Sequence, residues 1–307
     1  MDTDSLLDPE LATLVSGFML DDLDDTMVSA FRDVPPAPPL ESETVESIDH
    51  TVDGEPAIIV RVHRARGAAG ALPCVYSIHG GGYVVGSRDM DDVRLQGMCV
   101  ALGVVGVSVE YRLAPETTYP DPLEDCYRGL RWTHEHAAEL GVDPDRIAIR
   151  GTSAGGGLAA ALAILARDRG ELAVRCQLLE APMIDDRQQS ASSRRGDLAV
   201  WSNGSNSFGW RSYLGDLYGA DDVPDTAAPA RAEDLSGLPP AMIVVGAQDG
   251  FLDEDVDYAL RLGRAGVAVD LRVHAGACHG YQMFTDLPLT VRANREIDEW
   301  LGRQLAP

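Results

Sequence analysis

The chain has 307 residues, enough to bury the core of one large α/β domain, and it carries a formal net charge of −24 at pH 7. So acidic a surface repels nucleic acids and anionic lipids, and we expect neither as a partner. All 25 basic residues are arginine, because the chain contains no lysine. Lysine-dependent phosphate loops, Schiff-base chemistry and serine–lysine catalysis are therefore excluded.

The sequence gives no sign of a membrane or secreted protein. No apolar run reaches the ~20 residues that a bilayer-spanning helix needs, and the acidic start, Met1-Asp-Thr-Asp-Ser5, lacks the layout of a signal peptide. The five cysteines form no C-x-x-C pair, which fits buried thiols and neither a disulfide framework nor a zinc site. We expect a cytoplasmic protein without a metal or cofactor.

The first 40 residues differ from the rest of the chain. Short helical patterns at 11–18 and 27–31 are ended by the proline-rich run 34–39. Two stretches of alternating polarity, 44–52 and 57–62, then predict an antiparallel pair of strands.

Beyond residue 70, predicted strands and helices alternate. Continuous apolar strands between amphipathic helices predict a mostly parallel sheet that is covered on both faces, an α/β fold. The predicted strands are 74–78, 104–111, 147–150, 176–180, 241–246 and 268–273. The predicted helices are 88–102, 122–136, 157–167, 253–265 and 291–304.

Residues 185–238 interrupt this alternation, because they are far more than a crossover between two strands requires. The segment carries five aromatic residues among Ser, Asn, Gly and Arg, namely Trp201, Phe208, Trp210, Tyr213 and Tyr218. We interpret 185–238 as an inserted cap and 1–40 as its N-terminal part, with 41–184 and 239–307 forming the α/β domain. A long surface excursion with its own small core is the alternative.

The most informative motif is Gly151-Thr-Ser-Ala-Gly155, which stands between a predicted strand and an Ala/Leu-rich predicted helix. This is the sequence form of a nucleophile elbow, in which Ser153 stands on a sharp strand-to-helix turn. Glycines two residues before and after the serine remove side chains that would collide with neighbouring elements. The hydroxyl then lies at a helix N-terminus, where backbone N–H groups favour developing negative charge.

A nucleophilic serine needs a base and a carboxylate that orients it. His279 stands on a loop after the last predicted strand, and Asp249 at the exit of the strand before it, which gives the chain order Ser, Asp, His. The other histidines lie in strands or on a surface helix. The rival acid Asp253 has the position of a helix N-cap, and we interpret the acids after it as a solvated face: Glu254, Asp255 and Asp257.

The run His79-Gly80-Gly81-Gly82-Tyr83 comes directly after the strand 74–78. Residues without side chains let backbone N–H groups approach a substrate, so this loop is the predicted oxyanion hole. The predicted donors are Gly81, Gly82 and Ala154, while His79 anchors the loop by hydrogen bonds. Candidate walls of the substrate pocket are Tyr83, Met183, Trp201, Trp210, Phe251 and Tyr281.

Together these motifs resemble the hormone-sensitive-lipase-like carboxylesterases, also called bacterial family IV, over nearly the whole chain. The matching segments are His79–Gly82, Tyr111–Glu116, Gly151–Gly156 in the GTSAGG form, Asp249 with Asp253–Glu254, and His279–Gly280. The resemblance implies an α/β-hydrolase fold with a helical cap and hydrolysis of short- to medium-chain acyl esters without a cofactor. It also implies a possible homodimer through the edge of the sheet.

Two positions depart from the family pattern. The usual Asp-Pro-Leu-Arg at the acid is here Asp249-Gly-Phe-Leu252. The usual Phe after the His-Gly dipeptide is here Tyr281. The acid is kept, so the expected reaction is unchanged. The two departures make the identity of the substrate less defined. An amidase or deacetylase would use the same residues, and a ligand-binding receptor on the same scaffold is the alternative from a different class. The acidic surface argues against a lipase that docks on fat droplets.

Overall fold

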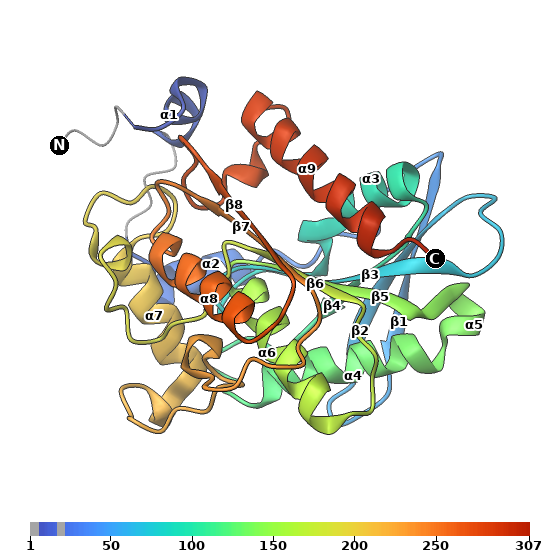
Figure 1. The fold of residues 1–307 in the computed structure, drawn as a ribbon, viewed down its shortest axis with the longest axis horizontal. Coiled ribbons are helices and arrows are strands. Elements are labelled where there is room, and N and C mark those ends of the chain that lie inside the picture. The colour runs from blue at the N-terminus through green and yellow to red at the C-terminus, as the bar shows by residue number, and fades with distance from the viewer. Residues whose placement is uncertain (1–5, 17–21) are drawn as a thin grey trace.

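The computed structural model describes residues 6–16 and 22–307, and within them eight strands form one sheet in the order β1-β2-β4-β3-β5-β6-β7-β8 (Figure 1). β1 pairs antiparallel with β2, and β2 with β4; all other pairs are parallel. The mostly parallel sheet and its antiparallel N-terminal pair are therefore confirmed. The strands are β1 Val45–Val52, β2 Ile58–Ala65, β3 Leu72–Ile78, β4 Val105–Glu110, β5 Val142–Thr152, β6 Cys176–Glu180, β7 Ala241–Gly246 and β8 Val269–His274.

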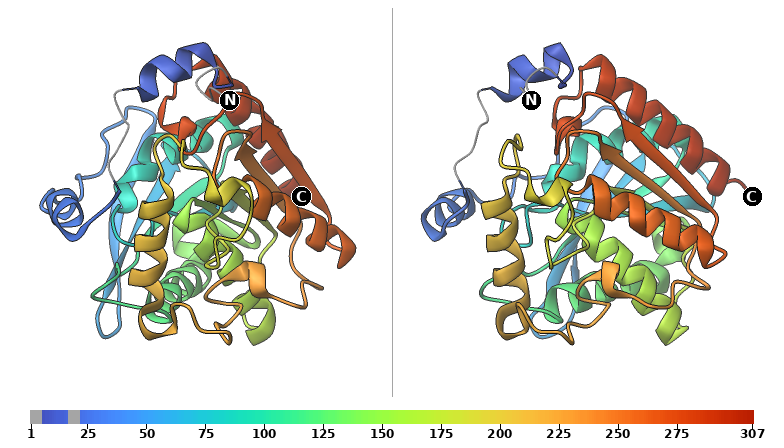
Figure 2. Two further views of the ribbon diagram at one scale, coloured as in Figure 1. Left: turned by 90° about the vertical axis from the view of Figure 1, so that its left-hand side faces the viewer. Right: turned by 60° about the vertical axis from the view of Figure 1, so that its left-hand side comes forward.

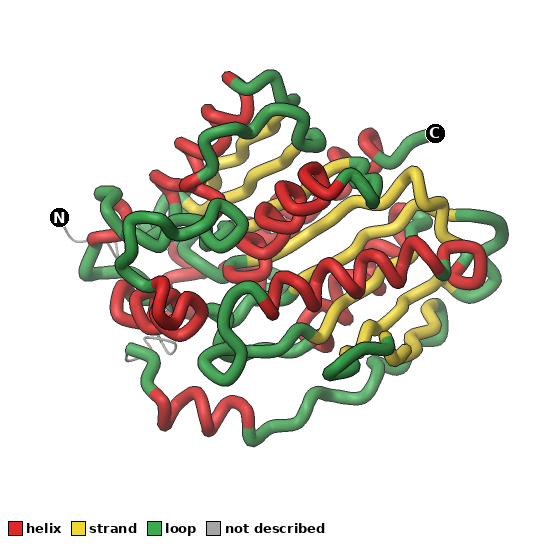
Figure 3. Tube along the Cα trace, turned by 90° about the horizontal axis from the view of Figure 1, so that it is seen from below, coloured by secondary structure: helices red, strands yellow, loops and turns green. Residues whose placement is uncertain are grey.

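Helices cover both faces of this sheet (Figures 1 and 3). One face packs against α3 and α9 through a cluster that includes Val75, Leu178 and Trp300. The other face packs against α4, α6 and α8 through a larger cluster that includes Tyr76, Ile149 and Ile243. Neighbouring strand residues serve opposite faces because side chains alternate along a strand. The helices are α1 Pro9–Val15, α2 Asp25–Arg32, α3 Asp92–Leu102, α4 Asp121–Glu135, α5 Ala137–Leu140, α6 Ala154–Arg169, α7 Asn203–Leu214, α8 Leu252–Arg264 and α9 Pro288–Gln304.

Several predicted boundaries differ from the observed ones. The predicted helix 88–102 divides into a 3₁₀ turn at Arg88–Asp91 and helix α3. Helix α6 begins at Ala154, three residues before its predicted start, because the serine turn leads into it without a linker. The predicted helix 11–18 is observed as α1, which ends at Val15; residues 17–21 lie outside the described part of the chain.

The inserted segment 185–238 contains α7 and lies beside the N-terminal helix α2 (Figure 2). Hydrogen bonds join the two segments: the Leu23 N–H donates to Ser205 Oγ at 3.0 Å, and Ser202 Oγ donates to Asp22 Oδ1 at 2.5 Å. The two parts assigned to the cap therefore touch each other. Their action as a cap stays a prediction.

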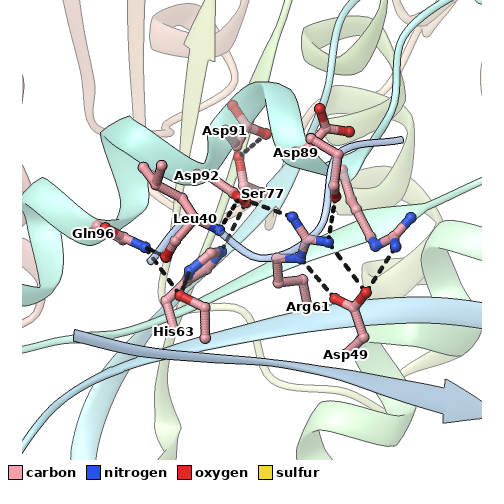
Figure 4. Close-up of polar contacts among 12 residues, drawn as sticks. Leu40, Asp49, Arg61, His63, Ser77, Asp89, Asp91, Asp92 and Gln96 are labelled. Atoms are coloured by element: carbon pink, nitrogen blue, oxygen red, sulfur yellow. Dashed lines mark hydrogen bonds and ion pairs between the residues drawn. The ribbon is translucent and has the colours of Figure 1, made fainter. Parts of the chain in front are cut away.

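A buried polar cluster joins the antiparallel strands to the start of α3 (Figure 4). The fully buried Arg61 pairs with Asp49 at 2.6 Å and with Asp92 at 2.8 Å. Beside it, His63 Nδ1 lies 2.8 Å from Ser47 Oγ. Burial, together with the positive charge of Arg61, lowers the pKa of His63 to about 4, so this histidine is neutral at pH 7. His63 therefore has a structural role in this cluster.

Candidate active site

Ser153 occupies a strained turn between β5 and α6. Its backbone has φ 58° and ψ −122°, a conformation that residues with a side chain rarely adopt. Two hydrogen bonds hold the turn on the neighbouring strand: the Ser153 N–H donates to Glu180 O at 2.8 Å, and the Met183 N–H donates to Ser153 O at 2.9 Å. The strain is therefore maintained by the sheet, and the side chain stands at the first turn of α6.

The glycines of the motif are required by close backbone contacts. A Cβ atom added to Gly151 would lie 2.0 Å from Gly155 O, and one added to Gly155 would lie 2.0 Å from Ile78 O at the end of β3. Gly155 O belongs to helix α6 and Ile78 O to strand β3, so neither atom can move without disturbing one of these elements. The structure thus gives a specific steric reason for the spacing of the G-x-S-x-G motif.

The structure brings the three predicted catalytic side chains into one hydrogen-bonded chain. His279 Nε2 lies 2.9 Å from Ser153 Oγ, and His279 Nδ1 lies 2.9 Å from Asp249 Oδ2. All three side chains are nearly buried, with Ser153 and His279 each 7% exposed and Asp249 2% exposed. The second carboxylate oxygen of Asp249 accepts from the Phe251 N–H at 3.0 Å. The geometry is that of a nucleophile, a base and an orienting carboxylate.

Sheet topology explains why residues from three distant parts of the chain meet here. β5, β7 and β8 run parallel, so the loops after them leave from the same edge of the sheet. The loops after β7 and β8 are also joined directly, because the Gln248 N–H donates to Ala277 O at 2.9 Å. The backbone thereby fixes the distance between the acid and the histidine.

Each predicted oxyanion donor is oriented by the carbonyl of its own peptide group. In a trans peptide the C=O and N–H point in opposite directions. Gly80 O accepts from His79 Nδ1 at 2.8 Å, and Gly81 O accepts from the N–H groups of Val84 and Val85 at 3.0 and 2.9 Å. The N–H groups of Gly81 and Gly82 must therefore point away from those contacts. Neither group donates a hydrogen bond to any of the described residues.

The third predicted donor, Ala154, is the first residue of α6, so its N–H lacks an intrahelical acceptor. Ser153 O, on the same peptide group, is held by Met183 and also accepts from the Gly157 N–H at 3.0 Å. His79 anchors the loop as predicted. Its ring stacks on Tyr111 with centroids 4.2 Å apart, and burial lowers its pKa.

The six predicted pocket residues have different surroundings. Phe251 meets the His279 ring edge-to-face with centroids 5.0 Å apart, and half-buried Trp201 lies 6.3 Å from the same ring. Tyr83, Met183 and Trp210 are fully buried in the main core. Tyr281 is also buried, and its hydroxyl bonds to His274 Nδ1 at 2.7 Å. Contact with a substrate stays a prediction for all six.

Of the three acids that the sequence assigns to a solvated face, Asp257 is exposed as predicted, whereas Glu254 and Asp255 are buried. Helix α8 has Phe251 at its N-cap, and Asp253 instead exchanges two hydrogen bonds with Ser192, of 2.8 and 3.0 Å. Glu254 is 6% exposed and accepts from the N–H groups of Ile184 and Asp185. These bonds join the start of α8 to Ile184 and Asp185, where the inserted segment begins, and to Ser192 within that segment.

Asp255 is fully buried, and neither of its carboxylate oxygens has a hydrogen-bond partner among the described residues. Burial raises its pKa well above the usual range, and the nearby carboxyls of Glu254 and Asp249 raise it further. The group is therefore more easily protonated in the folded chain than in the unfolded one.

Replacing Asp255 with Asn is expected to raise the stability at pH 7 by about 1–3 kcal/mol. A carboxyl whose pKa is raised on folding contributes fully below its unfolded pKa and loses that contribution as the pH rises towards the folded pKa. The gain of the variant over wild type should therefore shrink from pH 7 to pH 5, as urea denaturation would measure. Asp257→Asn, on the exposed face of the same helix, is the matched control; an equal gain in the control would refute the explanation.

The comparisons with known proteins establish the family of the chain. The sequence matches the family described as alpha/beta hydrolase fold over residues 75–283. The chain belongs to the α/β-hydrolase family. Carboxylesterase NlhH of Mycobacterium tuberculosis is 39% identical over 235 residues, 76% of this chain and 73% of the relative. Carboxylic ester hydrolase LipN of the same species is 35% identical over 90% of this chain and 77% of the relative.

A solved structure described as a bacterial heroin esterase superposes with a TM-score of 0.90 at 37% identity, over 99% of this α/β-hydrolase and 100% of that chain. The predicted hormone-sensitive-lipase-like family, the fold class and the class of carboxylic ester hydrolases are confirmed by these matches. None of the helices in residues 6–16 and 22–307 has the length and apolarity that crossing a membrane requires.

Proposed function

We propose that this α/β-hydrolase is a serine carboxylesterase that cleaves short- to medium-chain acyl esters of small molecules through an acyl-enzyme. The observation that carries the proposal is the unbroken chain of hydrogen bonds from Asp249 through His279 to Ser153. The relatives named as carboxylesterases and esterases support the same reaction. The low exposure of Ser153 and His279 supports a preference for small acyl groups.

In the proposed mechanism, His279 Nε2 takes the proton of Ser153 Oγ as this oxygen attacks the ester carbonyl. Asp249 holds the imidazole with Nδ1 protonated and stabilises its positive charge. The carbonyl oxygen becomes an oxyanion and accepts hydrogen bonds from the N–H groups of Gly81, Gly82 and Ala154. His279 then protonates the departing alcohol, and a water molecule activated by the same imidazole hydrolyses the acyl-enzyme.

The compartment and the assembly belong to the proposal as well. All five cysteines are free and buried, which supports a reducing, cytoplasmic location. β8 forms one edge of the sheet and exposes 44% of Val273, which supports pairing of this edge with a second copy.

The test combines turnover with labelling of the nucleophile. Hydrolysis of p-nitrophenyl acetate, butyrate, octanoate and palmitate should be fast for the first two and negligible for the last. A fluorophosphonate should stop this activity and add its mass to the tryptic peptide 151–167, which contains Ser153 as its one serine. Inertness towards all four esters, or a label on another peptide, would reject the proposal. Faster cleavage of matched anilides would favour the amidase instead.

A further inference from the structure

The inserted segment makes contact with the backbone of the oxyanion loop, residues 79–83, at Gly82. Gly82 has φ +60°, and a Cβ atom added to it would lie 2.2 Å from Cη2 and 2.7 Å from Cζ2 of Trp201. The outer edge of the indole thus occupies the space that a side chain at position 82 would need. Trp201 lies just before α7, so this contact joins the insertion to the predicted oxyanion hole.

A second contact reaches the same residue from helix α7. A Cβ atom added to Gly209 would lie 2.7 Å from Gly82 O and 3.3 Å from Met183 Cε. The backbone of α7 therefore lies against the Gly82 carbonyl without space for a methyl group. A glycine in the middle of a helix weakens it by about 1 kcal/mol relative to alanine, so this position has a packing reason.

The next residue of the loop is held by the same helix. Tyr83 stacks on Tyr213 with ring centroids 4.1 Å apart and meets Trp210 at 5.3 Å. Its hydroxyl donates to Met183 O at 2.8 Å, and the Met183 N–H donates to Ser153 O. One continuous set of contacts therefore runs from α7 through the oxyanion loop to the peptide group of the serine.

We propose that Trp201 and Gly209 are positioning residues, through which the insertion sets the location of the Gly82 N–H in the oxyanion hole. The inference rests on the proposed function. Gly81 O fixes the direction of this N–H, whereas Trp201 and Gly209 fix the Cα and the carbonyl of Gly82. The insertion then contributes to the stabilisation of the transition state as well as covering the substrate.

The physical argument concerns the small tolerance of an oxyanion hole. Its donors act when they stand 2.7–3.1 Å from the developing charge, and functional groups must be held within about 0.5 Å of that arrangement. A methyl group on Gly209 would require two backbone segments to separate by about that distance. The displaced N–H would bind the tetrahedral intermediate less well, while binding of the planar ester would change little.

The experiment compares Gly209→Ala and Trp201→Ala with Gly97→Ala, a helix glycine whose added Cβ would meet no atom within 4 Å. Both test variants should lower kcat for p-nitrophenyl butyrate about tenfold or more, with KM within about threefold. Inhibition by an aliphatic trifluoromethyl ketone, which forms a tetrahedral oxyanion on serine, should weaken by the same factor as kcat. The pH profile of Gly209→Ala should keep its midpoint, because this substitution changes neither His279 nor Asp249 and keeps the Trp201 ring beside His279.

A rise in KM with unchanged kcat and unchanged ketone inhibition would overturn the inference, since the insertion would then only contact substrate. Normal kcat in both variants would overturn it as well. If Gly209→Ala unfolds, Trp201→Ala decides, because this side chain is half-buried and its loss leaves the helix intact. A wild-type protein without esterase activity would reject the proposed function, whereas an active wild type with fully active variants would reject this inference alone.

Discussion

Alanine at position 153 is expected to lower kcat for p-nitrophenyl butyrate by about 10⁶-fold. The variant lacks the oxygen that would form the proposed acyl-enzyme, and no other described side chain bonds to His279 Nε2. The three proposed oxyanion donors and the proposed substrate contacts remain, so a residual acceleration of about 10³–10⁴ over water is expected. The single variants His279→Ala and Ser153→Ala should be equally slow, and their combination no slower, because the two residues act as one unit.

The measurement needs a rate assay sensitive enough for the residual activity, and labelling with a fluorophosphonate to exclude traces of wild type. Ser29→Ala, on the exposed surface of α2, is a matched control that should keep the wild-type rate. The melting temperature should be retained, because the Ser153 side chain bonds only to His279 among the described residues. A Ser153→Ala protein with more than about a hundredth of the wild-type rate would place the nucleophile elsewhere.

Much of the site could be predicted because its geometry is local or is fixed by topology. Gly151 and Gly155 are explained by the lack of space for side chains around one turn. A requirement so local is visible in a short sequence motif. Asp249 and His279 are explained by the rule that the loops after parallel strands leave from one edge of the sheet. The sequence order of the strands is enough to bring these loops together, without knowledge of any side-chain contact.

The burial of these acids could not be predicted, because the pattern of charges along a helix does not show which of its faces points into the protein. Glu254 and Asp255 look like solvated residues next to Asp253, yet α8 turns both towards the interior. Burial of Glu254 is compensated by the N–H groups of Ile184 and Asp185, which belong to a distant segment. Such compensation is a property of tertiary structure, so the sequence contains no local sign of it.

The start of α6 shows the same limit for secondary structure. The glycines at 155 and 156 disfavour a helix, which placed its predicted start at Gly157. The helix nevertheless begins at Ala154, because Gly155 packs on the end of β3 and Gly156 packs on Pro182. Close packing of backbone against backbone thus outweighs the local propensity. The contact of Gly209 with Gly82 is of the same kind, and its one local sign is a glycine between two aromatic residues.

Asparagine in place of Asp249 is expected to lower kcat by about 10⁴-fold while the fold is kept. The Phe251 N–H donates to Asp249 Oδ1, so the asparagine amide should keep its carbonyl oxygen at that position. Its NH₂ group would then replace Oδ2, which lies 2.9 Å from His279 Nδ1. An NH₂ group donates, so Nδ1 would have to accept and the proton of the imidazole would move to Nε2. A protonated Nε2 cannot take the proton of Ser153.

Asp253→Asn separates this explanation from a general effect of removing an acid near the site. Asp253 lies four residues further along and bonds to Ser192, away from the imidazole, so its variant should keep kcat within about threefold. The rates are to be measured at pH 7 together with the melting temperatures. The reverse pattern, a fast Asp249→Asn and a slow Asp253→Asn, would transfer the orienting role to Asp253. Since the 2.9 Å contact to Nδ1 belongs to Asp249, the tautomer of His279 depends on that carboxylate.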